Sequence, residues 1–135
     1  MNPLHWMRVA RPVALFAGAM DFLTGLGLVF DPVVTLRLMF VPPPADAALV
    51  YVRFVGAFVA AVGASYLIAL LRGGSERLRE VFASTTVFRL AAGLFTGVAV
   101  ATHQLSPPWL LVTATDLALV VGQQWLLRQQ DSHDV

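Results

Sequence analysis

The sequence predicts an all-α integral membrane protein, a four-helix bundle with a short interfacial helix between its first and second spans. Three observations predict this fold. The chain of 135 residues is 58% hydrophobic and only 13% charged, whereas soluble domains are roughly 25% charged. Its mean hydropathy is +0.74. It also contains four apolar stretches near the length of about 20 residues that a helix needs to cross a bilayer. The chain length predicts a single transmembrane domain over residues 1–135.

The four predicted spans cover residues 12–30, 48–71, 82–102 and 108–127. The first stretch is too long for the apolar core of a signal peptide and lacks a small-residue cleavage site, so we interpret it as a retained span. Before it, Asn2 and Pro3 are expected to start a short surface helix that carries Trp6. Pro12 is expected to mark where the span begins or bends.

Between the first two spans, Asp31 and Pro32 combine an N-cap with a proline at the first helical position. The apolar run 33–41 that follows is too short to cross a membrane and carries Arg37, so we expect a helix that lies at the outer interface. The three prolines 42–44 are expected to end this helix. Asp46 is then placed to cap the second span.

The last two spans are bounded in the same way. Gly73-Gly74 is expected to end the second span, and Ser75 with Glu76 suits the start of the third. Ser106-Pro107 is expected to begin the fourth span.

The arginines predict the orientation in the membrane. Seven of them flank the spans, and six of these precede the first span, follow the last, or lie between spans two and three, while only Arg37 lies on the opposite side. Basic residues favour the cytoplasmic side. We therefore expect a multi-pass protein of the bacterial inner membrane with both termini cytoplasmic. Trp6 and Trp125 are expected at the inner interface, and Tyr51 and Trp109 at the outer one.

Each span contains one ionisable residue at or near the apolar interior: Asp21, Arg53, Arg89 and Asp116. A charged side chain in a bilayer is costly, so it normally faces the bundle and has a partner. Asp21 and Asp116 fall near the midplane, at about 1.5 Å of rise per residue. We expect Arg53 and Arg89 to bridge the two aspartates, because a guanidinium remains charged and binds carboxylates with paired hydrogen bonds.

Small residues lie on the same helix faces as these charges and allow close helix packing. The interior of the bundle therefore offers candidates for the lining of a pocket around the polar core. These candidates are Gly25, Gly56, Thr96, His103, Thr113 and Gln123.

Three roles are open for the charged core. It can fix the register of the helices and do nothing more. It can line a pocket in which arginine donates and aspartate accepts hydrogen bonds while apolar walls hold the rest of a ligand. A proton or ion path is disfavoured, because arginine partners hold the aspartates ionised. His103 is expected at the outer interface, as a polar anchor or as part of a pocket mouth.

Several classes of site have no support in the sequence. The chain has no cysteine, which excludes disulfides and thiolate metal sites. No spacing of His, Asp and Glu predicts a metal site. We also expect no cofactor motif and no nucleic-acid partner, because no basic stripe lies outside the expected membrane-surface loops.

The segments Tyr51–Ala57 and Phe88–Leu94, each with an arginine followed by small residues, resemble small bacterial four-span proteins of the DoxX-like type. Members of that group are associated with quinone-linked redox complexes or have no assigned function, so the resemblance implies an accessory membrane subunit and no catalytic residue. The leading hypothesis is an inner-membrane protein that contacts membrane lipids and binds an isoprenoid, quinone or other lipid-like molecule. One alternative is an intramembrane isomerase with Asp21 or Asp116 as general acid and base, so enzymatic activity is undecided. The other is a transport component that works as a homo-oligomer or within a larger complex.

Overall fold

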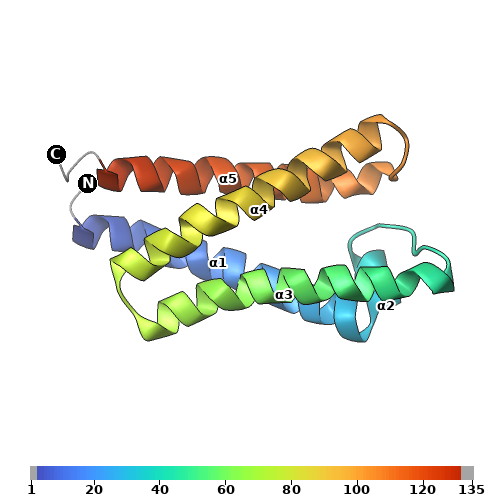
Figure 1. Ribbon diagram of the computed structural model, residues 1–135, viewed down its shortest axis with the longest axis horizontal. Coiled ribbons are helices and arrows are strands. Elements are labelled where there is room, and N and C mark those ends of the chain that lie inside the picture. Colours follow the sequence, from blue (N-terminus) through green and yellow to red (C-terminus); the bar gives the residue numbers. More distant parts are fainter. Residues whose placement is uncertain (1–2, 132–135) are drawn as a thin grey trace.

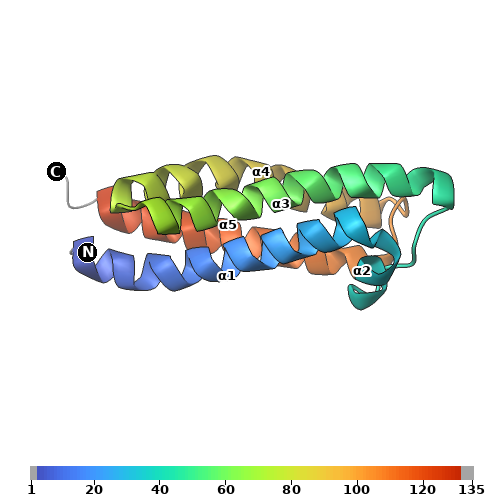
Figure 2. The same cartoon turned by 90° about the horizontal axis from the view of Figure 1, so that it is seen from below.

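The computed structural model describes residues 3–131, and within this range all regular structure is helical. Four long helices run side by side: α1 (Pro3–Phe30), α3 (Leu49–Arg72), α4 (Ser75–Ala101) and α5 (Leu110–Asp131) (Figures 1 and 2). The predicted all-α four-helix bundle is confirmed. We call the end where α1 begins and α5 ends the termini end. The opposite end, which carries α2, is called the loop end.

All four long helices are apolar enough to span a membrane. The candidate spans are His5–Phe30, Asp46–Arg72, Ser75–Ala101 and Pro107–Gln129. Large apolar side chains such as Leu23, Phe58, Phe95 and Val121 are exposed on the outside of the bundle. Contact of such a surface with lipid tails has no hydrophobic cost, whereas its contact with water is unfavourable. The chain is a multi-pass membrane protein.

Two helices begin earlier than their apolar stretches predict. The predicted surface helix and first span form one continuous helix that passes through Pro12. Helix α4 begins at Ser75, as Ser75 and Glu76 predict, and so precedes the apolar stretch that starts at residue 82; the polar segment before Phe82 is rich in Glu and Arg, which favour helix formation. Polarity marks the edge of the bilayer and does not by itself end a helix.

The predicted interfacial helix is present as α2 (Pro32–Leu38), capped by Asp31, whose carboxylate accepts a hydrogen bond from the Val34 amide at 3.2 Å. The prolines 42–44 do not end it. The chain turns earlier, where the amides of Phe40 and Val41 donate to the carbonyls of Arg37 and Leu36, as in a Schellman motif.

The expected cap of the second span by Asp46 is absent, whereas Ser106 and Pro107 begin the last span as expected. Asp46 begins a short 3-10 helix, η1 (Asp46–Ala48), and Ser106 precedes another, η2 (Pro107–Trp109). Neither element has a capping hydrogen bond from a side chain. The connection between α3 and α4 is a two-residue turn in which Gly73 and Gly74 have φ of 99° and 90°, a conformation that favours glycine.

The bundle consists of two helix pairs, α1 with α3 and α4 with α5, which separate toward the loop end (Figure 1). Glycines bring α1 and α3 into backbone contact. A Cβ on Gly25 would lie 2.2 Å from the Ala60 nitrogen, and one on Gly63 would lie 2.3 Å from the Phe22 nitrogen. No other residue fits at these positions without moving the helices apart.

An apolar cluster at the termini end joins the two pairs. Trp6 of α1, Tyr66 of α3, Phe82 of α4 and Leu126 of α5 are almost fully buried within it. The indole N–H of Trp6 donates to the Leu126 carbonyl at 2.9 Å, which links the first and last helices. Trp6, which the sequence predicts at the inner interface, is fully buried within the bundle because α5 covers the start of α1.

Candidate functional site

The buried charges meet where the two helix pairs face each other. Arg89 of α4 is 3% exposed, and its Nη2 contacts Asp21 Oδ2 of α1 at 2.5 Å while its Nη1 contacts Asp116 Oδ1 of α5 at 2.8 Å. We call Asp21, Arg89 and Asp116 the triad. The contact between Arg89 and Asp116 lies within one pair, whereas the contact with Asp21 connects the two pairs.

A hydrogen-bonded network continues from Arg89 toward the termini end. Its Nε donates to the Tyr66 hydroxyl at 3.2 Å, and the side-chain amide of Gln123 donates to the same oxygen. Since Tyr66 accepts both, its own proton points to Thr85 Oγ1 at 2.7 Å, and Thr85 donates to the Val81 carbonyl at 2.6 Å. The network therefore runs from Arg89 through the Tyr66 hydroxyl and Thr85 to the backbone of α4.

Arg53 does not join the triad, contrary to the expected pairing. Its side chain is exposed, and its guanidinium donates to the carbonyls of Val29 and Phe30. Those carbonyls end α1, and the last turn of a helix offers free carbonyls and the negative end of its dipole. The cation therefore binds a neighbouring helix terminus, and two carboxylates share one guanidinium.

The predicted pocket-lining residues lie in three different settings. Gly25 and Gly56 lie inside the α1–α3 contact, which leaves no space for a ligand. Thr96 and Thr113 bind each other at 2.7 Å between α4 and α5. His103 is exposed with φ of 59° in the turn that ends α4. Gln123 belongs to the Tyr66 network. These residues do not form one pocket.

Two grooves lie at opposite ends of the bundle, and no triad residue lines either. The groove at the loop end, here the loop-end groove, has a volume of about 400 Å³. It is bounded by α2, the loop after it, the start of α3 and the connection between α4 and α5. Its lining is Leu36, Val41, Pro42, Pro44, Ala48, Tyr51, Val52, Gln104, Leu105, Ser106 and Trp109.

The sequence patterns missed Tyr66, Thr85 and Thr86. The small-residue stripe of α3 through Gly56, Ala60 and Gly63 continues to Tyr66 at helical spacing, and this signal was available. Thr85 and Thr86 precede Arg89 by four and three residues, which places them one turn from it on α4. Thr86 donates to Gln123 Oε1 at 3.2 Å.

The described residues contain no group of three His, Cys, Asp or Glu side chains arranged to hold a metal ion. Comparisons with protein-family models, curated proteins and solved structures found no match to this chain.

Proposed function

We propose that this protein binds a quinone or an isoprenoid-like lipid in the loop-end groove, and that it acts in a bacterial inner membrane with both termini cytoplasmic. The observation that carries the proposal is the composition of the groove. Its volume of about 400 Å³ is typical of small-molecule sites, which are mostly apolar with a few polar groups.

The polar groups of this groove are hydrogen-bond donors. Trp109 offers an indole N–H, Tyr51 and Ser106 offer hydroxyls, and Gln104 offers an amide. None of these four side chains forms a hydrogen bond to another residue within 3–131. A quinone ring complements such a site, because its carbonyl oxygens only accept and its face stacks on an aromatic ring.

The position of the groove also suits a molecule with a long apolar tail. Tyr51 and Trp109 stand at the beginning of two candidate spans, where aromatic residues mark the membrane interface. Phe54 and Phe58 share the face of α3 below Tyr51 and are exposed. A tail that leaves the groove along this face enters the hydrocarbon region.

In this proposal the triad holds the two helix pairs together and does not contact the ligand. Both aspartates bind Arg89, which favours assembly over the alternative in which Asp21 or Asp116 acts as general acid and base on a substrate. We further propose that the protein is an accessory subunit of a membrane complex, as the DoxX-like resemblance implies, or that it forms a homo-oligomer.

The test is extraction of lipids from the purified protein followed by mass spectrometry. We expect a quinone or isoprenoid at one molecule per chain. Trp109→Leu should weaken binding of a short-tailed quinone about tenfold, the equivalent of the ~1.4 kcal/mol that a stacked aromatic ring contributes.

Trp125→Leu is the matched control, since Trp125 is a tryptophan of the same candidate span that lies near the termini end and does not line the loop-end groove. It should retain the ligand, and so should Asp116→Asn. Absence of a stoichiometric lipid, or equal loss in the two tryptophan variants, contradicts the proposal.

A further inference from the structure

A second groove lies between α4 and α5 at the termini end, and we call it the termini-end groove. It has a volume of about 360 Å³. On α4 it is lined at helical spacing by Glu76, Arg79, Glu80 and Ala83, and on α5 by Gln124, Leu127 and Arg128. Leu127 is 9% exposed and forms an apolar floor, while the small side chain of Ala83 leaves the groove open.

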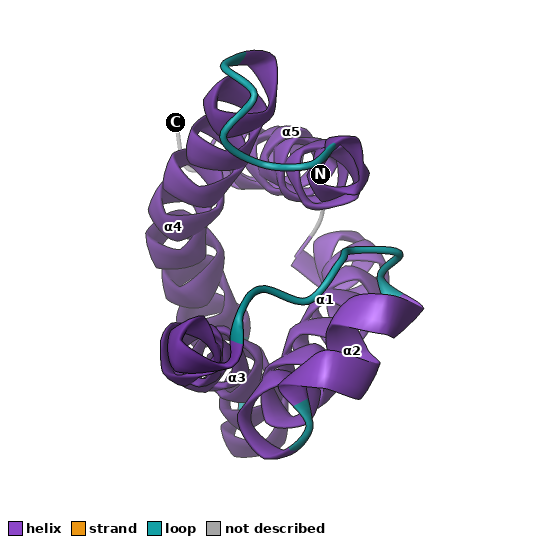
Figure 3. Ribbon diagram, turned by 90° about the vertical axis from the view of Figure 1, so that its right-hand side faces the viewer, coloured by secondary structure: helices purple, strands orange, loops and turns teal. Residues whose placement is uncertain are grey.

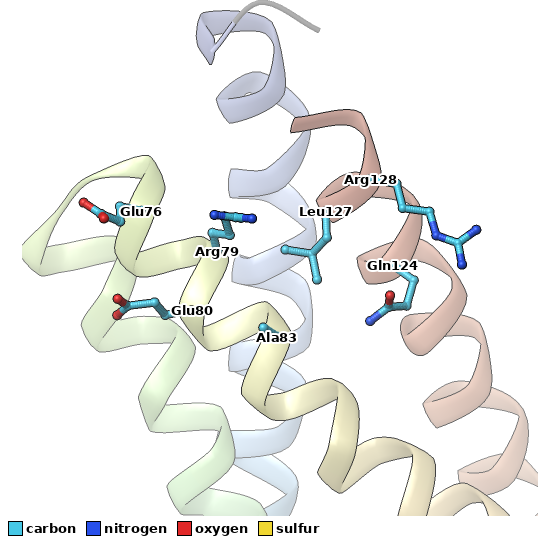
Figure 4. Close-up of a pocket in the computed structure, with 7 residues that line it drawn as sticks. All are labelled: Glu76, Arg79, Glu80, Ala83, Gln124, Leu127 and Arg128. Carbon is cyan, nitrogen blue, oxygen red and sulfur yellow. The ribbon is translucent and has the colours of Figure 1, made fainter. Parts of the chain in front are cut away.

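The charges are separated across this groove. Figure 4 shows the two glutamates toward one side, Arg128 toward the other, and Arg79 and Leu127 between them. The side chains of Glu76, Glu80 and Arg128 form no ion pair with each other or with another residue in the described range 3–131. Arg79 already has an interaction of its own, so the charged groups that the lining offers to a ligand are the two glutamate carboxylates and the guanidinium of Arg128.

The groove is also at the level of lipid head groups. Its residues occupy the first two turns of α4 and the last turns of α5, and both helices are candidate membrane spans. Charged side chains at the end of a span normally lie among lipid head groups. The nearest ligands of complementary size are phospholipid head groups.

We propose that the termini-end groove binds a phospholipid that carries both a phosphate and a primary ammonium group, such as phosphatidylethanolamine. Arg128 binds the phosphate, for which a guanidinium is well suited. The glutamates accept hydrogen bonds from the ammonium. Two other classes of lipid should bind less well. An anionic lipid without an amine would place its phosphate near the glutamate carboxylates with no ammonium between them. A choline lipid has no N–H group to donate to the carboxylates.

The experiment is native mass spectrometry of the full-length protein from micelles that contain equal amounts of phosphatidylethanolamine, phosphatidylglycerol and phosphatidylcholine. We expect phosphatidylethanolamine to be retained preferentially. Glu80→Gln should lower its ratio to phosphatidylglycerol about threefold, the effect expected for one exposed ion pair. Arg128→Gln should lower retention of all three lipids, because each carries a phosphate.

Arg77→Gln is the matched control, since Arg77 is exposed on the same turn of α4 and does not line the groove. It should leave the lipid ratios unchanged. The proposal is overturned if the wild-type protein shows no preference for phosphatidylethanolamine. It is also overturned if Glu80→Gln and Arg77→Gln have the same effect on the ratio while both remain folded by thermal denaturation. The loop-end groove has no part in either outcome.

Discussion

Among residues 3–131, Arg89 is the one cation in contact with Asp21, which is buried, and Asp116, which is partly buried. Its five N–H donors are arranged in a planar fork, and this geometry allows one side chain to contact Asp21, Asp116 and Tyr66 at once. A lysine has a single ammonium and does not span these three partners. Loss of Arg89 therefore leaves two aspartates without a counter-ion, whereas loss of either aspartate leaves one ion pair in place.

Arg89→Gln should lower the free energy of unfolding by about 3–5 kcal/mol, because the buried Asp21 and the partly buried Asp116 remain as two like charges without a counter-ion. Asp116→Asn should cost clearly less, since Arg89 and Asp21 remain as a balanced pair. Arg53→Gln is the control and should cost about 1 kcal/mol, the usual value of a cation at a helix C-terminus. Denaturation in detergent measures all three. Equal losses for Arg89→Gln and Asp116→Asn would show that the charge balance is unimportant.

The sequence was sufficient to identify Asp21, Arg89 and Asp116, because an ionised group within an apolar span has few alternatives to a buried partner. It was insufficient for Arg53. Whether that arginine faces an aspartate or the end of another helix depends on how far α1 extends beside α3, and this distance is a tertiary property. Tyr66 was missed because its hydroxyl has no charge and its ring is typical of a membrane helix.

At the scale of helices, glycine determines which pairs form. Gly18, Gly25, Gly56 and Gly63 allow the backbones of α1 and α3 to touch, which increases van der Waals contact where lipid provides no hydrophobic drive for association. Gly93 and Gly97 contact only side chains across α4 and α5, so that pair is less dependent on glycine.

Gly25→Ala and Gly63→Ala should each lower the free energy of unfolding by about 1–3 kcal/mol, the cost of overpacking a tight contact. The new methyl group would meet backbone, which does not move aside as a side chain does. Gly122→Ala is the control, because nothing lies within 4 Å of its added Cβ. Gly122→Ala should leave the free energy of unfolding unchanged or raise it slightly. If it lowers this free energy as much as Gly25→Ala or Gly63→Ala does, the helix pairing described above is wrong.

The existence and order of the helices followed from the apolar stretches, and the start of α4 followed from Ser75 and Glu76, but hydropathy alone did not give the full length of α1 and α4. Polar residues 75–80 continue α4 beyond the apolar stretch, and Pro12 lies within α1 without ending it. The grooves were not predictable either, since each is lined by residues from segments distant in the sequence.

At the scale of the whole molecule, the termini end and the loop end differ in charge and in construction. Six arginines lie before the first predicted span, after the last, or between the second and third. The turn at Gly73-Gly74 belongs to the same end as the start of α1 and the end of α5 (Figure 1). Figure 3 looks at the opposite end, with the loop between α2 and α3 and the loop between α4 and α5 toward the viewer. This arrangement supports the proposed cytoplasmic position of the termini end.

Because the natural chain has no cysteine, single cysteines can report the orientation without background. A cysteine at Gly74 should react with a membrane-impermeant maleimide only after the cells are opened. A cysteine at Pro43, in the loop after α2, should react in intact cells. The reverse result at both sites would invert the proposed topology.

The separation of Asp21 from Arg89 by 68 residues has a consequence for biosynthesis. When α1 and α3 have left the ribosome, their glycine faces can already associate, but Asp21 has no counter-ion until α4 is made. The carboxylate must therefore wait in the insertion machinery or at a polar boundary, since release into lipid alone is costly. A nascent chain in which Arg72 is followed by a polar linker long enough to fill the ribosomal exit tunnel should remain cross-linkable to the translocation channel, and Asp21→Asn should release it.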